Sequence, residues 1–225
     1  MTGTGLPDIP GVKLERTLPG ADWEHYLLLT FGEPCEVVSS APLNGGFGVR
    51  RALLNRSVQK NWRCDDPTAE LTQYVARLGL NPDTTVGLIT AVSMADLHYS
   101  SAERSGWRVH TLLTAGVGNA AAAGGRFALD TSGAGTVNVM VLLEGSLSPA
   151  ALVGAVQSVT EAKTAAFREA GVTTRFGEAA TGTTTDTVTA VNLRPKPHSP
   201  YAGLATTLGF LLAETVYTAL LAALS

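Results

Sequence analysis

The chain has 225 residues, of which 45% are hydrophobic and 24 are glycine, and its formal net charge is −3. This length suits one substantial globular domain, so residues 1–225 are expected to form a single domain in which residues 1–20 are partly flexible. The small negative charge and the absence of a dense basic block argue against a nucleic-acid-binding protein. The first residues contain no apolar core of a secretory signal, and we expect a cytoplasmic protein.

Cysteine and histidine spacing argues against a metal centre. Cys35 and Cys64 lack the spacing of metal ligands and are expected to be reduced thiols. No two of the four histidines stand two or four residues apart, so we expect no metal site. His110 lies within a predicted strand and is expected to be packed, whereas His98 lies in an irregular stretch and is the better candidate for a functional histidine.

The first half of the chain is predicted to be rich in strands. Apolar, β-branched runs predict strands at His25–Phe31, Glu36–Ser40 and Val86–Ala91. The polar stretch Arg50–Cys64 suggests a strand with a loop, and Val92–Tyr99 is ambiguous between extended chain and a helical turn. The stretch Ala41–Gly48 must be a loop, because its Asn-Gly-Gly sequence favours positive φ. A helix is predicted over Pro67–Leu78, with Asp66 as its N-cap and Gly79 as its end.

The second half is predicted to alternate between strands and long helices. Strands are predicted at Trp107–Thr114, Val137–Leu143 and Thr187–Leu193, and the second of these has an almost unbroken apolar pattern typical of a strand covered on both faces. A helix is predicted over Pro149–Ala170, where Ser148 is the N-cap, Pro149 the first helical residue and Gly171 the stop.

The last segment, Ala202–Leu224, is nominally long enough to span a bilayer and contains a single charge, Glu214. Its threonine, alanine and glycine residues make it only weakly hydrophobic. We therefore expect a largely buried core helix over roughly Leu204–Leu224, and no membrane partner.

Together these elements predict an α+β fold, with a mixed β-sheet core covered by three main helices. The alternative is a layered α/β arrangement in which sheets are sandwiched between helices. No linker divides the chain, and the sequence leaves open whether it forms a homo-oligomer.

Three sets of polar residues fall at strand ends or on the central helix, where polar groups need a partner or a ligand. They are Asn119 with Asn138, Glu161 with Lys163, and Thr183 and Thr184 with Asp186. Because Glu161 and Lys163 are two residues apart, they point about 200° away from each other on a helix. Each of the two is interpreted either as functional or as a solvated charge, and the threonines either as turn residues or as a nucleophile.

Seven short motifs, taken together, resemble the adenosylcobinamide amidohydrolase family. The resemblance covers roughly Leu27 to Leu224. The motifs occur in chain order; they are PLNGG (42–46), GLITAV (87–92), TAGVGNA (114–120), GTVNV (135–139), TEAKTAA (160–166), ATGTTTD (180–186) and YAGLATTLG (201–209).

The resemblance implies a corrinoid-salvage enzyme that hydrolyses the amide joining the aminopropanol arm of adenosylcobinamide to the corrin ring. The products are adenosylcobyric acid and 1-amino-2-propanol. The corrinoid is then a substrate and small-molecule partner rather than a cofactor, and no cofactor is expected.

For this reaction we expect a broad cleft lined by backbone groups, amides and hydroxyls, because a corrin is flat and fringed with amides. Glu161 or Asp186 is the predicted base for water, Lys163 orients the carboxylate or protonates the amine, and Asn119 or nearby backbone N–H groups hold the oxyanion. The residues predicted to bind substrate are Asn44, Gly45, Gly46, Gly116, Gly118, Asn138, Gly182, Thr183 and Thr184.

Two alternatives stay open from the sequence. One is a corrinoid-binding protein without activity, which would hold the same ligand unchanged. The other is an unrelated acyl or peptide hydrolase, suggested by the strand at 137–143 followed by the helix at 149–170, which would form a covalent acyl-enzyme.

Overall fold

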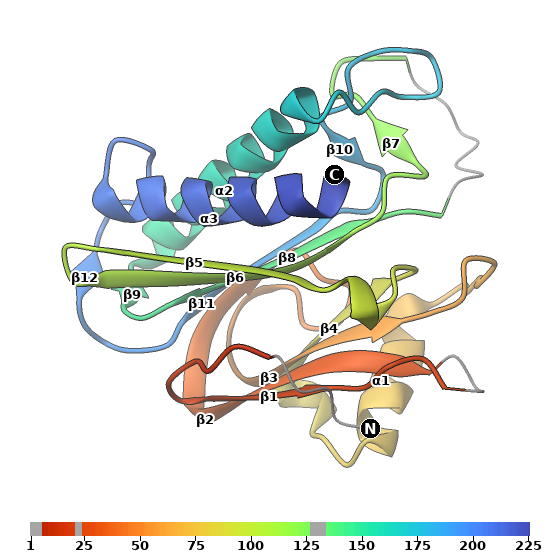
Figure 1. The fold of residues 1–225 in the computed structure, drawn as a ribbon. Coiled ribbons are helices and arrows are strands. Elements are labelled where there is room, and N and C mark those ends of the chain that lie inside the picture. The colour runs from red at the N-terminus through yellow and green to blue at the C-terminus, as the bar shows by residue number, and fades with distance from the viewer. Residues whose placement is uncertain (1–5, 21–23, 127–133) are drawn as a thin grey trace.

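A computed structural model describes residues 6–20, 24–126 and 134–225 as one domain built on a mixed, eight-stranded sheet (Figure 1). The strands follow the order β4-β3-β2-β11-β8-β6-β5, and β1 pairs with β2 beside this path. The strand bounds are β1 Val12–Arg16, β2 His25–Ser39, β3 Gly46–Ser57, β4 Thr85–Thr90, β5 His98–Arg104, β6 Trp107–Ala115, β8 Val137–Leu143 and β11 Thr187–Asn192. The helices are α1 Pro67–Arg77, α2 Pro149–Glu169 and α3 Thr207–Leu224, with 3₁₀ turns at Pro82–Thr84 and Met94–Asp96.

Four short strands lie outside the main sheet and pin loops to one another. The strand β10 (Gly182–Thr183) pairs with β7 (Ala120–Ala121), so the turn after β6 lies beside the turn before β11. At the other end of the molecule, β12 (His198–Ser199) pairs with β9 (Ser146–Leu147).

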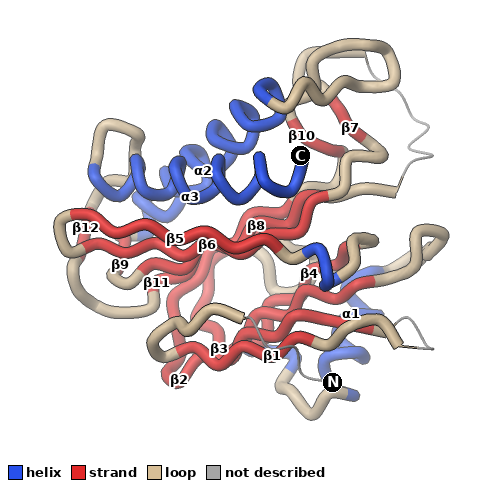
Figure 2. Tube along the Cα trace, in the orientation of Figure 1, coloured by secondary structure: helices blue, strands red, loops and turns tan. Residues whose placement is uncertain are grey.

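The main sheet folds over at β2, so that its two halves form separate layers (Figures 1 and 2). The first part of β2 pairs with β1 and β3, its last part pairs with both β3 and β11, and the register with β3 shifts between Thr30 and Cys35. A core lies between the layers, with Leu29 and Leu53 from one and Met140 and Leu142 from the other. The expected α+β fold is confirmed, and its layers run α2/α3, sheet, sheet, α1.

The strands β11, β8, β6 and β5 form the layer that lies uppermost in Figure 1, called the upper layer here. Within it, all seven residues of β8 are buried, as the sequence predicted. Val137, Val139 and Val141 belong to the core under the helices, whereas Met140 and Leu142 face the second layer. Asn138 is two residues before Met140 and therefore lies on the same face of β8, so its amide points into the space between the layers.

The two long helices cover the outer face of this upper layer. As predicted, α2 is capped by Ser148, whose hydroxyl accepts from the N–H of Ala151 at 3.2 Å, and Gly171 follows it with φ +66°. The helix α3 is long and apolar enough to cross a membrane, and 44% of its residues are buried. Here it packs on α2, β5 and β6, with Leu212 and Leu220 fully buried.

Several bounds differ from the predicted ones. The strand β2 is continuous, because the irregular step around Pro34 bends the strand without ending it. The strand β5 was not predicted, since its polar, alternating sequence packs only one face on α3. The helix α3 begins at Thr207 rather than near Leu204, because the hydroxyl of Thr206 caps it by accepting from Gly209 N–H at 3.0 Å.

Candidate active site

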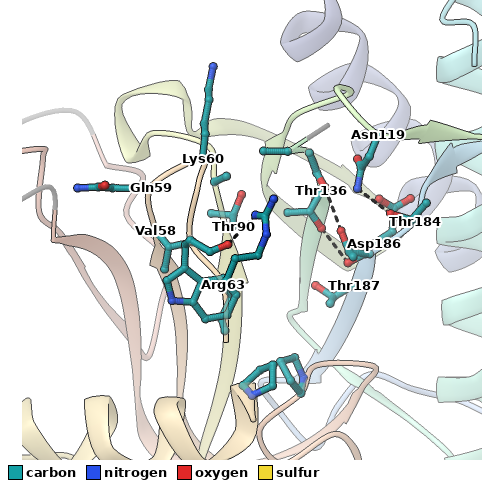
Figure 3. A pocket seen from close by; sticks show the side chains of 18 of the residues that line it. Val58, Gln59, Lys60, Arg63, Thr90, Asn119, Thr136, Thr184, Asp186 and Thr187 are labelled. Carbon is teal, nitrogen blue, oxygen red and sulfur yellow. Dashed lines mark hydrogen bonds between the residues drawn. The ribbon is translucent and has the colours of Figure 1, made fainter. Parts of the chain in front are cut away.

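A cleft of about 520 Å³ opens between the two layers, where the amino ends of β8 and β11 face the carboxyl ends of β3 and β4. Figure 3 shows Gln59, Lys60 and Arg63 on one side of it, and Asn119 and Thr184 on the other. Six hydroxyl side chains line the cleft: Ser40, Thr90, Thr136, Thr184, Thr185 and Thr187. A hollow with this lining suits a ligand with many uncharged hydrogen-bonding groups.

A buried polar network forms the floor of the cleft. Thr114, Asn138 and Thr187 are direct cross-strand neighbours on β6, β8 and β11. Asn138 donates to Asn55 Oδ1 at 2.8 Å and to Ile89 O at 2.9 Å, and it accepts from Thr187 Oγ1 at 2.7 Å. Because these side chains are buried and mutually satisfied, the network ties the two layers together directly beneath the cleft.

Asn119 and Thr184 meet at the wall of the cleft. Asn119 Nδ2 donates to Thr184 Oγ1 at 2.7 Å, and no acceptor for the Thr184 hydroxyl proton is found among the described residues. Asn119 Oδ1 is buried without a partner in the described structure, against the Cα side of Gly135. A side-chain amide thus holds the oxygen of an exposed threonine while leaving its proton free to react.

Close backbone packing around Gly135 holds Asn119 in place. A Cβ on Gly135 would lie 2.5 Å from Asn119 Oδ1, 2.6 Å from Gly116 O and 2.7 Å from Gly118 N. A Cβ on Gly118 would lie 2.5 Å from Ala134 O. Gly118, which was predicted to bind substrate, therefore serves here to bring two backbone segments together, whereas a Cβ on Gly116 would first meet the Val92 side chain, at 2.9 Å.

Gly135→Ala is expected to lower activity at least about tenfold, because the added methyl must displace Asn119 and with it the Thr184 hydroxyl. Initial rates on the substrate, together with a thermal melt, measure the effect. Gly203→Ala is the matched control, since no atom lies within 4 Å of the Cβ it would add. Equal rates for the two variants would show that the packing at Gly135 does not position the site.

Asp186 lies at the edge of the cleft, but both oxygens of its carboxylate already accept hydrogen bonds from protein donors. Oδ1 accepts from Val137 N at 2.9 Å and from the Thr183 hydroxyl, and Oδ2 accepts from Thr183 N at 3.0 Å and from Lys163 Nζ. A carboxylate has about four acceptor sites, so these donors leave none for water. Gly182 packs so closely on the Lys163–Asp186 pair that a Cβ would clash with both side chains.

The opposite wall is the loop between β3 and α1, and Glu70 anchors it. Glu70 accepts from Arg56 Nη1 at 2.5 Å and from Trp62 Nε1 at 3.2 Å. Desolvation by burial opposes ionisation of Glu70, but hydrogen bonds from Cys64, Arg56 and Trp62 outweigh it and lower the pKa of the carboxyl. The loop that carries Lys60 and Arg63 is therefore held in place from below.

The structure brings together only part of the predicted site. Asn119, Thr184 and Asp186 line the cleft, Asn138 lies in its floor, and Lys163 and Thr183 lie behind Asp186. Glu161 is exposed on the other side of α2, in a shallow hollow of about 280 Å³ lined by that helix alone. The opposite orientations of Glu161 and Lys163 follow from their spacing of two residues.

The Asn44–Gly46 loop also lies outside the cleft lining, although neighbouring Pro42 contributes to it. Asn44 adopts φ +55° and donates to Pro82 O at 2.6 Å and Thr85 O at 2.7 Å. Gly45 packs against backbone, where a Cβ would lie 2.5 Å from Ala41 O. The expected positive φ occurs at Asn44 and Gly46, but the loop predicted over Ala41–Gly48 is shorter, because β3 begins at Gly46. The Asn44 side-chain amide binds the start of β4.

The histidines lie elsewhere. His110 is 2% exposed and contacts Tyr99 Oη at 2.9 Å and Glu144 Oε1 at 3.0 Å, so it is packed as predicted. His98, the better candidate, begins β5 and does not line the cleft. No cluster of metal-ligating side chains occurs among the residues that the structure describes.

Sequence reasoning missed the cleft residues that come from the first half of the chain. Thr90 lies in the strand predicted at Val86–Ala91, and Lys60 and Arg63 lie in the polar stretch for which a strand with a loop was suggested. Polar residues at the end of a buried strand were the available signal, and Thr90 carries it as clearly as the residues selected in the second half.

The chain is similar in sequence to one family of known proteins and in fold to solved structures. A family model described as adenosylcobinamide amidohydrolase matches residues 11–225. An adenosylcobinamide amidohydrolase from Methanosarcina mazei is 30% identical over 190 residues, covering 80% of this chain and 86% of that protein. The crystal structure of the PH0078 protein from Pyrococcus horikoshii OT3 has a TM-score of 0.50 at 12% identity, covering 98% of this chain and 88% of the other. A Burkholderia sp. beta-aminopeptidase has a TM-score of 0.47 at 11% identity over 99% and 88% of the two chains.

Proposed function

The chain belongs to the adenosylcobinamide amidohydrolase family and is an amidohydrolase, and from that premise we propose that it hydrolyses the aminopropanol amide of adenosylcobinamide. The proposed products are adenosylcobyric acid and 1-amino-2-propanol, and the proposed role is corrinoid salvage in the cytoplasm. The corrinoid is the substrate in this scheme.

The observation that carries the proposal is the cleft between the layers, with six hydroxyls and the Asn119 amide in its lining. A corrin presents carboxamide groups around its rim, and each needs a donor or an acceptor when it leaves water. Threonine and asparagine supply both without a net charge. The open side of the cleft leaves room for a ring too large to be enclosed.

We assign the attack on the amide to Thr184. Its oxygen accepts from Asn119 Nδ2 at 2.7 Å, which favours the negative charge that develops when the hydroxyl loses its proton. Thr184 Oγ1 bonds to the amide carbon, the C–N bond breaks, and the hydroxyl proton leaves with the amine nitrogen. Water then hydrolyses the resulting ester, giving the acid and restoring the hydroxyl.

The second hydrogen of Asn119 Nδ2 is the proposed donor to the oxyanion, because Asn119 lines the same wall as Thr184. Asp186 and Lys163 serve in this scheme to hold the turn that presents Thr184, since their charged groups already bind each other. Glu161 has no part in it, because its side chain lies on the opposite side of α2.

The function is tested by incubating the purified protein with adenosylcobinamide and identifying both products by mass spectrometry. We expect one equivalent each of the acid and the amine. A corrinoid recovered unchanged after prolonged incubation would contradict the proposal and favour the binding protein without activity. Hydroxylamine added during turnover is expected to trap the acyl group as a hydroxamate, because the scheme passes through an ester.

A further inference from the structure

The outer face of the two long helices exposes apolar side chains. Figure 1 shows α2 and α3 on the outside of the upper layer, where they pack on each other. The helix α3 has a mean hydropathy of 1.6 and a single charged residue, Glu214, yet only 44% of its residues are buried. Phe210 is 44% exposed, Tyr217 and Leu221 are only partly buried, and all three lie on the same stripe of the helix as Glu214. A contiguous apolar face of this kind marks an interaction surface.

The same face of α2 carries two charges of opposite sign with no partner in the described part of the chain. Glu161 and Arg168 are both exposed, and neither forms an ion pair with a described residue. They are seven residues apart, which is about two helical turns or about 10 Å along the axis. Between them lies the hollow of about 280 Å³, whose other lining residues are Thr160, Thr164 and Ala165.

The hollow between these charges presents methyl groups rather than free hydroxyls. Thr160 Oγ1 donates to Val156 O at 2.8 Å, and Thr164 Oγ1 donates to Thr181 O at 3.2 Å. Because both hydroxyl protons are already used inside the chain, the side chains of Thr160, Thr164 and Ala165 can lose water at little cost.

This charge pattern is complementary to itself under a twofold axis. In an antiparallel pair of identical helices, the numbers of any two facing residues have the same sum. An axis between Thr164 and Ala165 therefore places Glu161 of each copy opposite Arg168 of the other, so two ion pairs form at once. The small side chains at the axis allow the helices to approach closely, and the long charged side chains flank them.

We propose that the chain forms a twofold homodimer through the outer face of α2 and α3, in which Glu161 of each copy pairs with Arg168 of the other. Two helices about 30 Å long and about 10 Å wide offer about 600 Å² on each copy, or about 1,200 Å² in total, which is the lower end for a stable complex. We therefore expect a dissociation constant in the micromolar range. The inference goes beyond the proposed function and needs no substrate.

The test is sedimentation velocity of the full chain over an about hundredfold range of concentration, where a monomer–dimer equilibrium is expected. Arg168→Glu and Glu161→Arg each place like charges opposite one another twice in the dimer, and each is expected to raise the dissociation constant at least about tenfold. Added salt should reduce this effect by screening the repulsion. The Glu161→Arg/Arg168→Glu double variant restores opposite charges and should return the dissociation constant to within about threefold of the parental value.

The matched controls are Glu33→Arg and Arg51→Glu, which make the same changes of charge at exposed positions on β2 and β3. Both are expected to keep the parental dissociation constant. Glu161→Gln should weaken the dimer only slightly, because an exposed ion pair contributes little when a charge is removed rather than reversed.

Three outcomes would overturn the proposal. The first is a monomer at every concentration. The second is a dimer that the single charge reversals do not weaken, or that the double variant does not restore, because the copies would then meet through another face or register. The third is a monomer that sediments with phosphatidylcholine vesicles, because the apolar stripe of α3 would then face a lipid surface. None of these measurements uses the substrate, so the dimer and the proposed function can fail separately.

Discussion

Replacing Thr184 with valine is expected to reduce turnover of adenosylcobinamide at least about a thousandfold. The change keeps the shape of the side chain and removes only the hydroxyl, which lies at an exposed position of the cleft wall. Because Thr184 is exposed and its described hydroxyl hydrogen bond is the one with Asn119, the melting temperature should stay close to that of the parental protein. Initial rates of aminopropanol release and a thermal melt measure both expectations.

The neighbouring hydroxyl of Thr185 supplies the matched control. It lies on the same turn and lines the same cleft, but its proton is already given to Gly135 O at 2.9 Å. Thr185→Val should therefore cost less than about tenfold in turnover, an effect on the shape of the turn rather than on the reaction.

Asn119→Ala is expected to reduce turnover about a hundred- to a thousandfold, because it removes both the contact that holds Thr184 and a donor to the oxyanion. Asn119→Asp tests the same contact with a carboxylate, which accepts from the hydroxyl and no longer donates to it. The assignment fails if Thr184→Val keeps its activity while Thr136→Val or Thr187→Val loses it, since these hydroxyls lie at the start of β8 and β11 in the same cleft.

The local parts of this site were predictable because local rules fix them. The apolar run at 137–143, the cap at Ser148 and the stop at Gly171 specify a buried strand followed by a helix, and all three appear in the structure. The polar positions at the ends of these elements followed from the same pattern. Asn138 was selected in this way, and it is buried and fully hydrogen-bonded between the layers.

The folding of the sheet was not predictable, because it depends on contacts between distant segments. The bend in β2 at Thr30–Cys35 brings β3 and β4 opposite β8, and only then do Lys60 and Thr90 face Thr136. Nothing in the local sequence of the polar stretch at 50–64 specifies this partner. Periodicity indicates which face of an element is buried, but the partner of that face follows from the complete topology.

Helical spacing alone separates the two charged residues of α2, and the structure gives them different roles. Lys163 and Asp186 form a buried pair in which the two side chains are 9% and 11% exposed. Glu161, two residues earlier, faces away from this pair and lines a different hollow. The sequence left open whether each charge was functional or solvated, and burial now distinguishes them.

Lys163→Met is expected to destabilise the protein by about 3–5 kcal/mol, because it leaves the Asp186 carboxylate buried without its counter-charge. Asp186→Asn should cost a similar amount by leaving the ammonium group of Lys163 unpaired. The free energy of unfolding from urea titrations measures both effects. The double variant should be less destabilised than the sum of the two single variants, since neither unpaired charge remains.

Glu161→Gln is the matched control on the same helix, and it should leave both the unfolding free energy and the turnover unchanged. Turnover distinguishes the two interpretations of Asp186, which are that its carboxylate holds the turn carrying Thr184 or that it is the base for water. If the carboxylate only holds the turn that carries Thr184, activity of Asp186→Asn should fall in parallel with the disturbance of that turn and recover in part when Lys163 is also replaced. If Asp186 is instead the base for water, the double variant stays as inactive as the single one, because the second change restores charge balance but no proton acceptor.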